Sequence, residues 1–435
     1  MNTATFTATV VSNTNKESDV LVVGAGVIGL SGALALLLQG RSVRILEART
    51  VGAGASHGNC GTITPSHAPP LAAPGIIARA LGWSLQPNAP LYIPPRFDPA
   101  LWRWLLAFAR RCNTRDWHAT ALAKSALLNA SRPALAEWVQ RLDLQCEFRE
   151  TGEDYVFRDT HAFVQGQEEL DLLAECGVEV ELIDGADYER QEPAMRRGVA
   201  GALRFRGDAS LRPDEYVAEL SRVLRERGAD LIEGTPVAHV ERTGDRWRVR
   251  TADGAEYFAR DVVLSTGAWS AQLEQIAGSS VRPLARALQP GKGYSITYSR
   301  PAVVPSRPLV LRERFVCVSM WDGMLRIGST MEFSGFDATL NERRFRALEQ
   351  AADDYLLYPS GPQTLERWTG WRPMVSDDIP LIGAVPGQKG LWLHTGHGMM
   401  GMSMSTASSL LLSQLIVGES DLLIDPTPYR PERFI

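Results

Sequence analysis

The sequence predicts an α/β protein, and three observations carry this prediction. Residues 19–23, DVLVV, form a β-branched run typical of a buried parallel strand. From Val27 to Gly40, apolar and small residues repeat at helical spacing and end at a glycine, a common helix terminator. SVRILEA at 42–48 then has the composition of a second buried strand. Together they predict strand, glycine-rich turn, helix and strand.

The remaining segments alternate between helical and strand-like patterns. Residues 1–18 are polar and predict a disordered tail without a secretory signal. Residues 96–180 are mainly helical, interrupted by a predicted hairpin at 148–160. Residues 199–270 predict strand, helix, strand, a three-stranded meander and a further buried strand. After them come strand-like segments at 281–332, a charged helix at 340–356, and two strands with a final helix.

Composition limits the possible classes of protein. The chain has 435 residues, 45% of them apolar, which predicts two or three globular domains. A net charge of −5 without a basic block argues against a nucleic-acid partner. The five cysteines are widely spaced and form no CxxC pattern, so neither a disulfide framework nor a metal site is expected. The glycines and Asp19 within 19–40 argue against a membrane span there. We therefore expect a cytoplasmic protein.

A G-x-G-x-x-G motif follows the first predicted strand and opens the first predicted helix. Gly24 permits a tight turn, Gly26 allows close approach of a pyrophosphate, and Gly29 allows close packing of helix on strand. The amide groups of Val27 and Ile28 would then face the phosphates at the helix N-terminus. Glu47, at the end of the next strand, is placed to accept hydrogen bonds from ribose hydroxyls. This pattern predicts a dinucleotide site, with a structural glycine turn as the alternative.

A second loop of small residues occupies positions 52–61, GAGASHGNCG. Small residues allow the main chain to pass close to a diphosphate and a ring system, and this loop favours FAD over NAD. A flexible surface loop is the alternative. The residues predicted here and beside Glu47 to contact the cofactor are Ala48, Ser56, Gly58, Asn59 and Gly61.

Longer motifs extend the pattern to the C-terminus: PLAAPG (70–75), GKGYSIT (291–297), WTGWRP (368–373), DDIPLIG (377–383) and TGHGMMGMSMS (395–405). With the two glycine-rich segments, they make the chain resemble the FAD-dependent D-amino-acid oxidase superfamily, and most of all the bacterial D-amino-acid dehydrogenases. The resemblance spans nearly the whole chain from Asp19. An NAD-dependent dehydrogenase, a non-catalytic flavoprotein and an RNA-modifying relative are the alternatives.

The resemblance implies a Rossmann-like FAD-binding domain and a substrate domain with an antiparallel sheet that covers the flavin. We assign residues 19–95, 185–280 and 366–435 to the first and 96–184 and 281–365 to the second. Further FAD neighbours are implied at Val237, Gly267, Thr395, Gly396, His397, Gly398, Met399 and Met400. Near residues 395–400, a helix N-terminus would favour negative charge on the flavin pyrimidine.

Four residues are candidates for substrate binding or catalysis. In the family, the arginine of G-x-R-P grips the substrate carboxylate, and Arg372 in Gly370-Trp371-Arg372-Pro373 matches it. The alternative is an ion pair with Asp377 or Asp378. Tyr294 is a second candidate contact, with core packing as its alternative. His57 is a candidate substrate or catalytic residue and His397 a candidate on the flavin side, although a single histidine often has only a packing role.

The implied reaction is oxidation of a D-amino acid to a 2-oxo acid by hydride transfer from Cα to flavin N5. The alternative substrate is a cyclic imino acid such as D-proline or 4-hydroxy-D-proline. Related sarcosine oxidases bind flavin through a cysteine in the segment equivalent to 366–383, where this chain has none. Noncovalent FAD is therefore expected. The resemblance implies a quinone-type electron acceptor, with peripheral contact to the inner face of the inner membrane, and direct oxidation by oxygen is the alternative.

Overall fold

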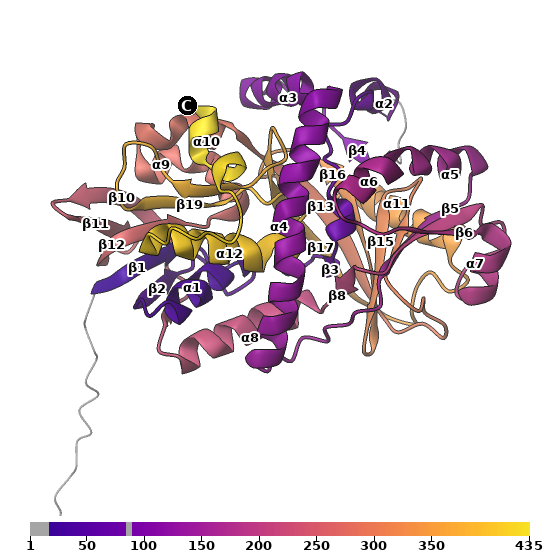
Figure 1. The fold of residues 1–435 in the computed structure, drawn as a ribbon, viewed down its shortest axis with the longest axis horizontal. Helices are drawn as coiled ribbons and strands as arrows, with labels where there is room; N and C mark the ends of the chain where they lie inside the picture. Colours follow the sequence, from indigo (N-terminus) through magenta and orange to yellow (C-terminus); the bar gives the residue numbers. More distant parts are fainter. Residues whose placement is uncertain (1–16, 84–88) are drawn as a thin grey trace, which may run out of the picture.

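The computed structural model describes residues 17–83 and 89–435, and most of its strands belong to two large sheets (Figure 1). The first has eight strands, with the central order β10-β11-β12-β1-β2-β9, and β19 and β18 continue from β12. β1 lies parallel to both β12 and β2. The strands are β1 (Glu17–Val23), β2 (Val43–Leu46), β9 (Asp230–Ile232), β10 (Val237–Thr243), β11 (Arg246–Thr251), β12 (Glu256–Leu264), β18 (Leu381–Ala384) and β19 (Leu391–Thr395).

The second sheet has nine strands, in the order β17-β13-β16-β15-β14-β5-β7-β6, with β4 paired to β16. Most of its neighbours are antiparallel, and β5–β14 and β4–β16 are parallel. The strands are β4 (Leu91–Tyr92), β5 (Glu153–Phe157), β6 (Glu181–Asp184), β7 (Gly201–Phe205), β13 (Leu288–Ser299), β14 (Leu309–Leu311), β15 (Val316–Trp321), β16 (Met324–Glu332) and β17 (Thr364–Val375). A separate ribbon pairs β3 (Thr62–Ile63) with β8 (Ala209–Ser210).

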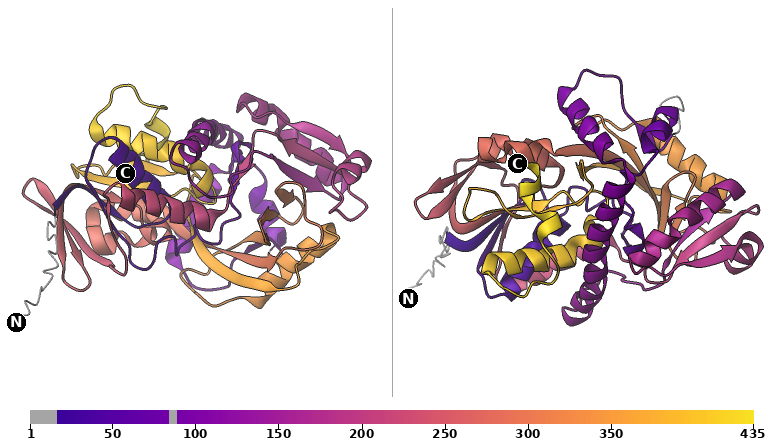
Figure 2. Two further views of the ribbon diagram at one scale, coloured as in Figure 1. Left: turned by 90° about the horizontal axis from the view of Figure 1, so that it is seen from below. Right: turned by 45° about the horizontal axis from the view of Figure 1, so that its top comes forward.

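Helices cover both sheets. α1 packs against α12 and α8, and α4 packs against α12 and runs across the middle of the molecule (Figures 1 and 2). α11 covers one face of the second sheet. Within the described ranges, no helix is long and apolar enough to cross a membrane. The α-helices are α1 (Val27–Leu38), α2 (Ile76–Trp83), α3 (Pro99–Arg111), α4 (Thr114–Arg141), α5 (Thr160–Gly166), α6 (Leu170–Glu175), α7 (Gly185–Gln191), α8 (Pro213–Glu226), α9 (Glu274–Ala277), α10 (Arg282–Arg286), α11 (Glu342–Tyr355) and α12 (Gly401–Val417).

The N-terminal half of the first sheet agrees with the prediction from sequence. The strand, turn, helix and strand expected at 19–48 are β1, α1 and β2. The predicted tail, 1–18, is too long at its end, because Glu17 and Ser18 belong to β1 and pair with Phe258 and Ala259 of β12. The rest of that predicted tail, 1–16, lies outside the described residues.

The predicted hairpin and three of the segment assignments differ from the structure, because strand pairing joins distant segments. The hairpin expected at 148–160 is wrong: β5 is a single strand there, and its neighbours are β7 and β14. β7 and α7 both fall within the predicted FAD-binding segment 185–280. β7 is a strand of the second sheet, and α7 contacts β6 and β7 of that sheet. β17, assigned to the segment 366–435, is an edge strand of the second sheet. β4, within 19–95, pairs with β16 of the same sheet.

Candidate active site

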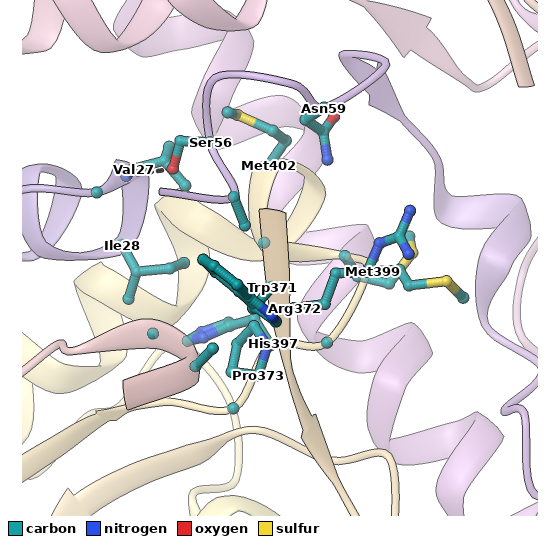
Figure 3. Close-up of a pocket in the computed structure, with 18 of the residues that line it drawn as sticks. Val27, Ile28, Ser56, Asn59, Trp371, Arg372, Pro373, His397, Met399 and Met402 are labelled. Carbon is teal, nitrogen blue, oxygen red and sulfur yellow. Dashed lines mark hydrogen bonds between the residues drawn. The ribbon is translucent and has the colours of Figure 1, made fainter. Parts of the chain in front are cut away.

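A cavity of about 770 Å³ lies where the parallel strands of the first sheet end. Its wall includes Val23, Leu46 and Thr395, which end β1, β2 and β19, and Ser265, which follows β12. The carboxyl edge of a parallel sheet is where ligands bind in open α/β folds. The second sheet closes the other side with residues of β17, and Figure 3 shows Trp371 and Arg372 facing residues from both ends of the chain.

The turn between β1 and α1 depends on two glycines. Gly24 has a φ of +105°, and a Cβ there would lie 2.5 Å from the carbonyl oxygen of Ser265. A Cβ at Gly29 would lie 1.9 Å from the carbonyl oxygen of Gly24. Any side chain at Gly29 would push α1 away from the turn, which is consistent with the packing role predicted for it. Gly29 itself is not on the cavity wall.

Two side chains hold this turn at the cavity. The Val27 amide donates to Ser56 Oγ at 3.0 Å, drawn as a dashed line in Figure 3. Glu47 Oε2 accepts from the Ala25 amide at 2.7 Å, and its Oε1 accepts from the Arg49 amide at 2.9 Å. The predicted loop of small residues therefore binds the N-terminus of α1, and the glutamate fixes the glycine turn.

Most residues predicted to contact the cofactor lie on this one wall. From the N-terminal motifs these are Gly24, Gly26, Val27, Ile28, Glu47, Ala48, Ser56, Gly58 and Asn59, and from later segments Val237, Gly267, Gly396, His397, Gly398, Met399 and Met400. Gly61 is not on the wall. Its φ is +69°, and a Cβ there would lie 2.0 Å from the Leu211 carbonyl oxygen, so its role is in packing.

His397 lies on the wall just before the N-terminus of α12. Its ring is 4% exposed, and neither ring nitrogen has a hydrogen-bond partner in the described structure. Burial lowers its pKa to about 3, so the ring is neutral at physiological pH. α12 begins at Gly401 with no side-chain hydrogen bond to its cap. A buried ligand with hydrogen-bonding groups would satisfy both the ring and the helix end.

Arg372 is a partly buried cation without a carboxylate partner among the described residues. Its Nη1 donates to the Thr330 carbonyl oxygen at 2.8 Å. The predicted alternative partners are otherwise engaged, because Asp377 pairs with Arg433 and Asp378 pairs with Lys124. Burial lowers the pKa of Arg372, and an anion in contact with it would raise the pKa again. The cavity therefore has a site for a carboxylate.

Tyr294 lies on the cavity wall, but its side-chain contacts favour core packing over the predicted substrate contact. Its side chain is 1% exposed, and its hydroxyl donates to Glu332 Oε2 at 2.9 Å. The ring contacts Phe345 of α11 with centroids 5.3 Å apart. Arg372 of β17 pairs with Gly291 of β13, so both positions face the cavity side of the sheet. Side chains alternate between the two faces of a strand, and Tyr294 is three residues from Gly291. The Tyr294 side chain therefore points to the opposite face, toward α11. These contacts favour the core-packing alternative, and the substrate contact stays a prediction.

The position of His57 favours a structural role over the predicted catalytic one. Its Nε2 lies 2.7 Å from Glu366 Oε1, and the residue is not on the cavity wall. The hydrogen bond with Glu366 raises the pKa of His57, which stabilises an ion pair between them. His57 therefore joins the small-residue loop to β17.

Several residues on the wall were not predicted from sequence. Ser265 and Thr266 follow β12, and the rule that parallel strands end at one edge could have identified them. Cys60 and Cys317 lie on the wall, and a hydrogen bond to Cys317 lowers the pKa of the Cys60 thiol. No sequence signal indicated His67, whose pKa is lowered to about 3 by burial.

A family model described as "DAO: FAD dependent oxidoreductase" matches residues 19–415. The chain belongs to this family. The match confirms the predicted resemblance and the prediction that the protein is an enzyme with FAD as its cofactor. A D-amino acid dehydrogenase of Cereibacter sphaeroides is 33% identical over 415 residues, covering 92% of each chain.

Solved structures of the same fold support the architecture of this FAD-dependent oxidoreductase. Glycine oxidase from Geobacillus kaustophilus has a TM-score of 0.73 at 22% identity, covering 96% of this chain and 99% of its own. L-Proline dehydrogenase from P. horikoshii has a TM-score of 0.72 at 18% identity, covering 96% and 98%. At these identities the likeness concerns the fold, and the predicted α/β fold class is confirmed.

The residues of this FAD-dependent oxidoreductase fit a dinucleotide flavin. The cavity volume lies within the usual range of about 300–1,000 Å³ for cofactor sites. The buried ring nitrogens of His397 and the buried Ser265 hydroxyl have no protein partner in the described structure. Gly267 has a φ of +54° and open space where a Cβ would stand. These features leave room and unmet hydrogen bonds for a cofactor along the wall.

Proposed function

We propose that this enzyme oxidises D-amino acids to 2-oxo acids and transfers the electrons to a quinone-type acceptor. The observation that carries the proposal is the partly buried guanidinium of Arg372, which lies on the cavity wall without a carboxylate partner in the described structure. A substrate carboxylate would supply the missing negative charge through two parallel hydrogen bonds. The relative from C. sphaeroides, named a D-amino acid dehydrogenase, supports this class of substrate.

The chain's own residues would bind and orient the two reactants. The β1–α1 turn, Ser56 and Glu47 would hold the dinucleotide, and His397 with the start of α12 would hold its ring end. We expect the FAD to be noncovalent. When bound, FAD supplies the acceptor of the hydride that leaves Cα. Arg372 would fix the carboxylate, so that the Cα–H bond has a single orientation in the cavity.

Proton transfer does not require a strong base on this wall. His67 and His397 both have a pKa lowered to about 3, so both rings are uncharged and weakly basic at neutral pH. The substrate ammonium would lose its proton to solvent before the hydride leaves, and the nitrogen lone pair of the neutral amine would then drive formation of the imine. Water hydrolyses the imine to a 2-oxo acid and ammonia.

The test is anaerobic mixing of the holoenzyme with D-alanine, L-alanine and D-proline, followed by flavin absorbance. We expect D-alanine to bleach the flavin and release ammonia, and L-alanine to leave it oxidised. Bleaching by D-proline alone, without ammonia release, would favour the cyclic imino acid alternative. If none of a wider panel of D-amino and D-imino acids bleaches the flavin, the proposal is wrong.

Arg372 is tested in the same assay. Loss of a bidentate charged contact costs about 3–4 kcal/mol, so Arg372→Leu should reduce kcat/KM about 100- to 1,000-fold, mainly through KM. Arg367→Leu is the matched control, because Arg367 lies on the same strand and forms ion pairs with Glu342 and Glu349. Near-normal KM in Arg372→Leu would remove Arg372 from the carboxylate site.

The acceptor is tested separately from the substrate. We expect reduction of a soluble quinone analogue to be much faster than oxygen consumption with the same D-amino acid. Stoichiometric hydrogen peroxide in air would instead identify an oxidase. A quinone-type acceptor dissolved in lipid implies peripheral contact with a membrane, because no helix in the described ranges could span one.

A further inference from the structure

An exposed apolar surface lies on α2, α3 and the segment before α3. We call it the α2–α3 surface and define its apolar part as Ile77, Phe97, Trp102 and Leu106. These side chains are 41%, 93%, 55% and 62% exposed. Figures 1 and 2 show α2 and α3 at one edge of the molecule, projecting beyond the sheets.

The opposite face of α3 is already packed, so its apolar outer face is not needed for the core. Leu101 and Trp104 are buried against Phe333 and Met374. The Trp104 indole N–H also donates to the Ala287 carbonyl oxygen at 3.0 Å. Trp102 and Leu106, one helical turn apart, point away from this contact and are more than half exposed. α2 has no buried residue.

Positive charge is concentrated on the same surface. Between residues 71 and 111 the chain has five arginines and one aspartate, whereas the whole chain has a net charge of −5. The aspartate, Asp98, caps α3 by accepting from the Leu101 amide and pairs with Arg96 at 2.6 Å. Arg79, Arg103 and Arg110 are exposed among the apolar side chains. An acidic protein therefore presents a basic, aromatic-containing edge.

We propose that the α2–α3 surface docks on an anionic lipid bilayer. Phe and Trp side chains enter the interfacial layer of a bilayer, and arginines beside them bind the phosphates. Each basic residue near an anionic bilayer strengthens binding about fivefold. These apolar side chains project from α2, α3 and the segment before α3, and in the described structure none lies on the wall of the cavity described above. This arrangement suits the flat face of a bilayer better than a protein ligand.

The surface adjoins the cavity. Ile76 and Arg79 of α2 line the cavity wall, and Ile77 beside them is exposed on the outside. A lipid-soluble electron acceptor would therefore reach the cavity from the side where the bilayer lies. This last link rests on the proposed quinone-type acceptor, whereas docking itself does not.

The experiment is co-sedimentation of the flavin-loaded full chain with phosphatidylcholine vesicles, with and without 30% phosphatidylglycerol. We expect binding to the anionic vesicles, at least tenfold weaker binding to neutral ones, and release at high salt. Phe97→Ser with Trp102→Gln should weaken binding at least tenfold, and so should Arg103→Glu with Arg110→Glu. Flavin absorbance, melting temperature and reduction of a soluble dye by D-amino acids should match wild type in all of them.

Two matched controls show whether any loss of vesicle binding is specific to the α2–α3 surface, or follows from removing any exposed apolar side chain or reversing any exposed charge. Val164→Ser removes a 58%-exposed apolar side chain from α5, and Arg197→Glu reverses an exposed charge elsewhere. Neither should change vesicle binding. Docking is overturned if folded wild type does not bind anionic vesicles, or if the α2–α3 variants bind as well as the controls. A loss of dimer in size-exclusion chromatography of these variants, without vesicle binding by wild type, would assign the surface to a second copy of the chain.

Discussion

Replacing Gly293 by alanine tests the position of the Arg372 guanidinium. A Cβ at Gly293 would lie 2.4 Å from Cζ and Nη1 of Arg372 and 2.5 Å from Nη2. Ordinary carbon contacts are about 3.5–4.0 Å, so the guanidinium must move by about 1 Å. That shift would break one of two charged hydrogen bonds to a carboxylate, at a cost of about 1.5–3 kcal/mol. We expect kcat/KM for D-alanine to fall about 10- to 150-fold, mainly through KM.

The assay is steady-state dye reduction, with the melting temperature measured on the same preparations. Gly293 does not have the positive φ that favours glycine, and the atoms it would displace end a side chain. The melting temperature should therefore stay close to wild type. Gly207→Ala is the control, because a Cβ at Gly207 meets nothing within 4 Å. An unchanged KM in Gly293→Ala would refute the reasoning, and so would activity lost only in proportion to unfolded protein.

Three further predictions concern Tyr294, His57 and the cofactor. Tyr294→Phe should lower the free energy of unfolding by about 1–3 kcal/mol in urea, because buried Glu332 loses its O–H donor, while kcat/KM stays within about twofold of wild type; a large loss of kcat at unchanged stability would contradict this. Glu366 raises the pKa of His57, and His57 lowers the pKa of Glu366. The ion pair therefore stabilises the fold most between the ordinary pKa values of 4.5 and 6.5. This stabilisation is lost as the pH rises through the raised pKa of His57, or as it falls through the lowered pKa of Glu366. His57→Gln should then destabilise the protein at a pH of about 5.5 and not at about 9, without loss of activity, and equal destabilisation at both would exclude the ion pair. Acid precipitation should release all the flavin into the supernatant, and flavin retained in the pellet would show a covalent bond.

The cofactor half of the site could be predicted because local chemistry determines it. A side chain at Gly29 would collide with the backbone of Gly24 in the same turn, and one at Gly24 would collide with the backbone of Ser265, just after β12. The spacing of those glycines therefore identifies the turn, the helix that follows and the strands beside it. Arg372 could be found from its motif, and the structure then excluded its two alternative partners.

The substrate half could not be predicted in the same way. β13 is buried on both faces, so its sequence has no alternation that would show which way Tyr294 points. The partner of His57 is Glu366, which lies 309 residues later in the chain. The hairpin predicted at 148–160 is wrong because the neighbours of β5 are β7 and β14, which come from distant segments. Contacts of this kind leave no local signal.

The first sheet is closed by segments from the two ends of the described chain. β19 pairs with β12, which also pairs with β1 and β11, and α12 packs against α1. The cavity wall likewise combines residues 23–28 with residues 394–403. During synthesis, the N-terminal glycine turn leaves the ribosome long before its C-terminal counterpart exists. Cofactor loading must therefore be one of the last events in the maturation of this enzyme, and a chain arrested before β19 would present half a binding wall and an open sheet edge to chaperones.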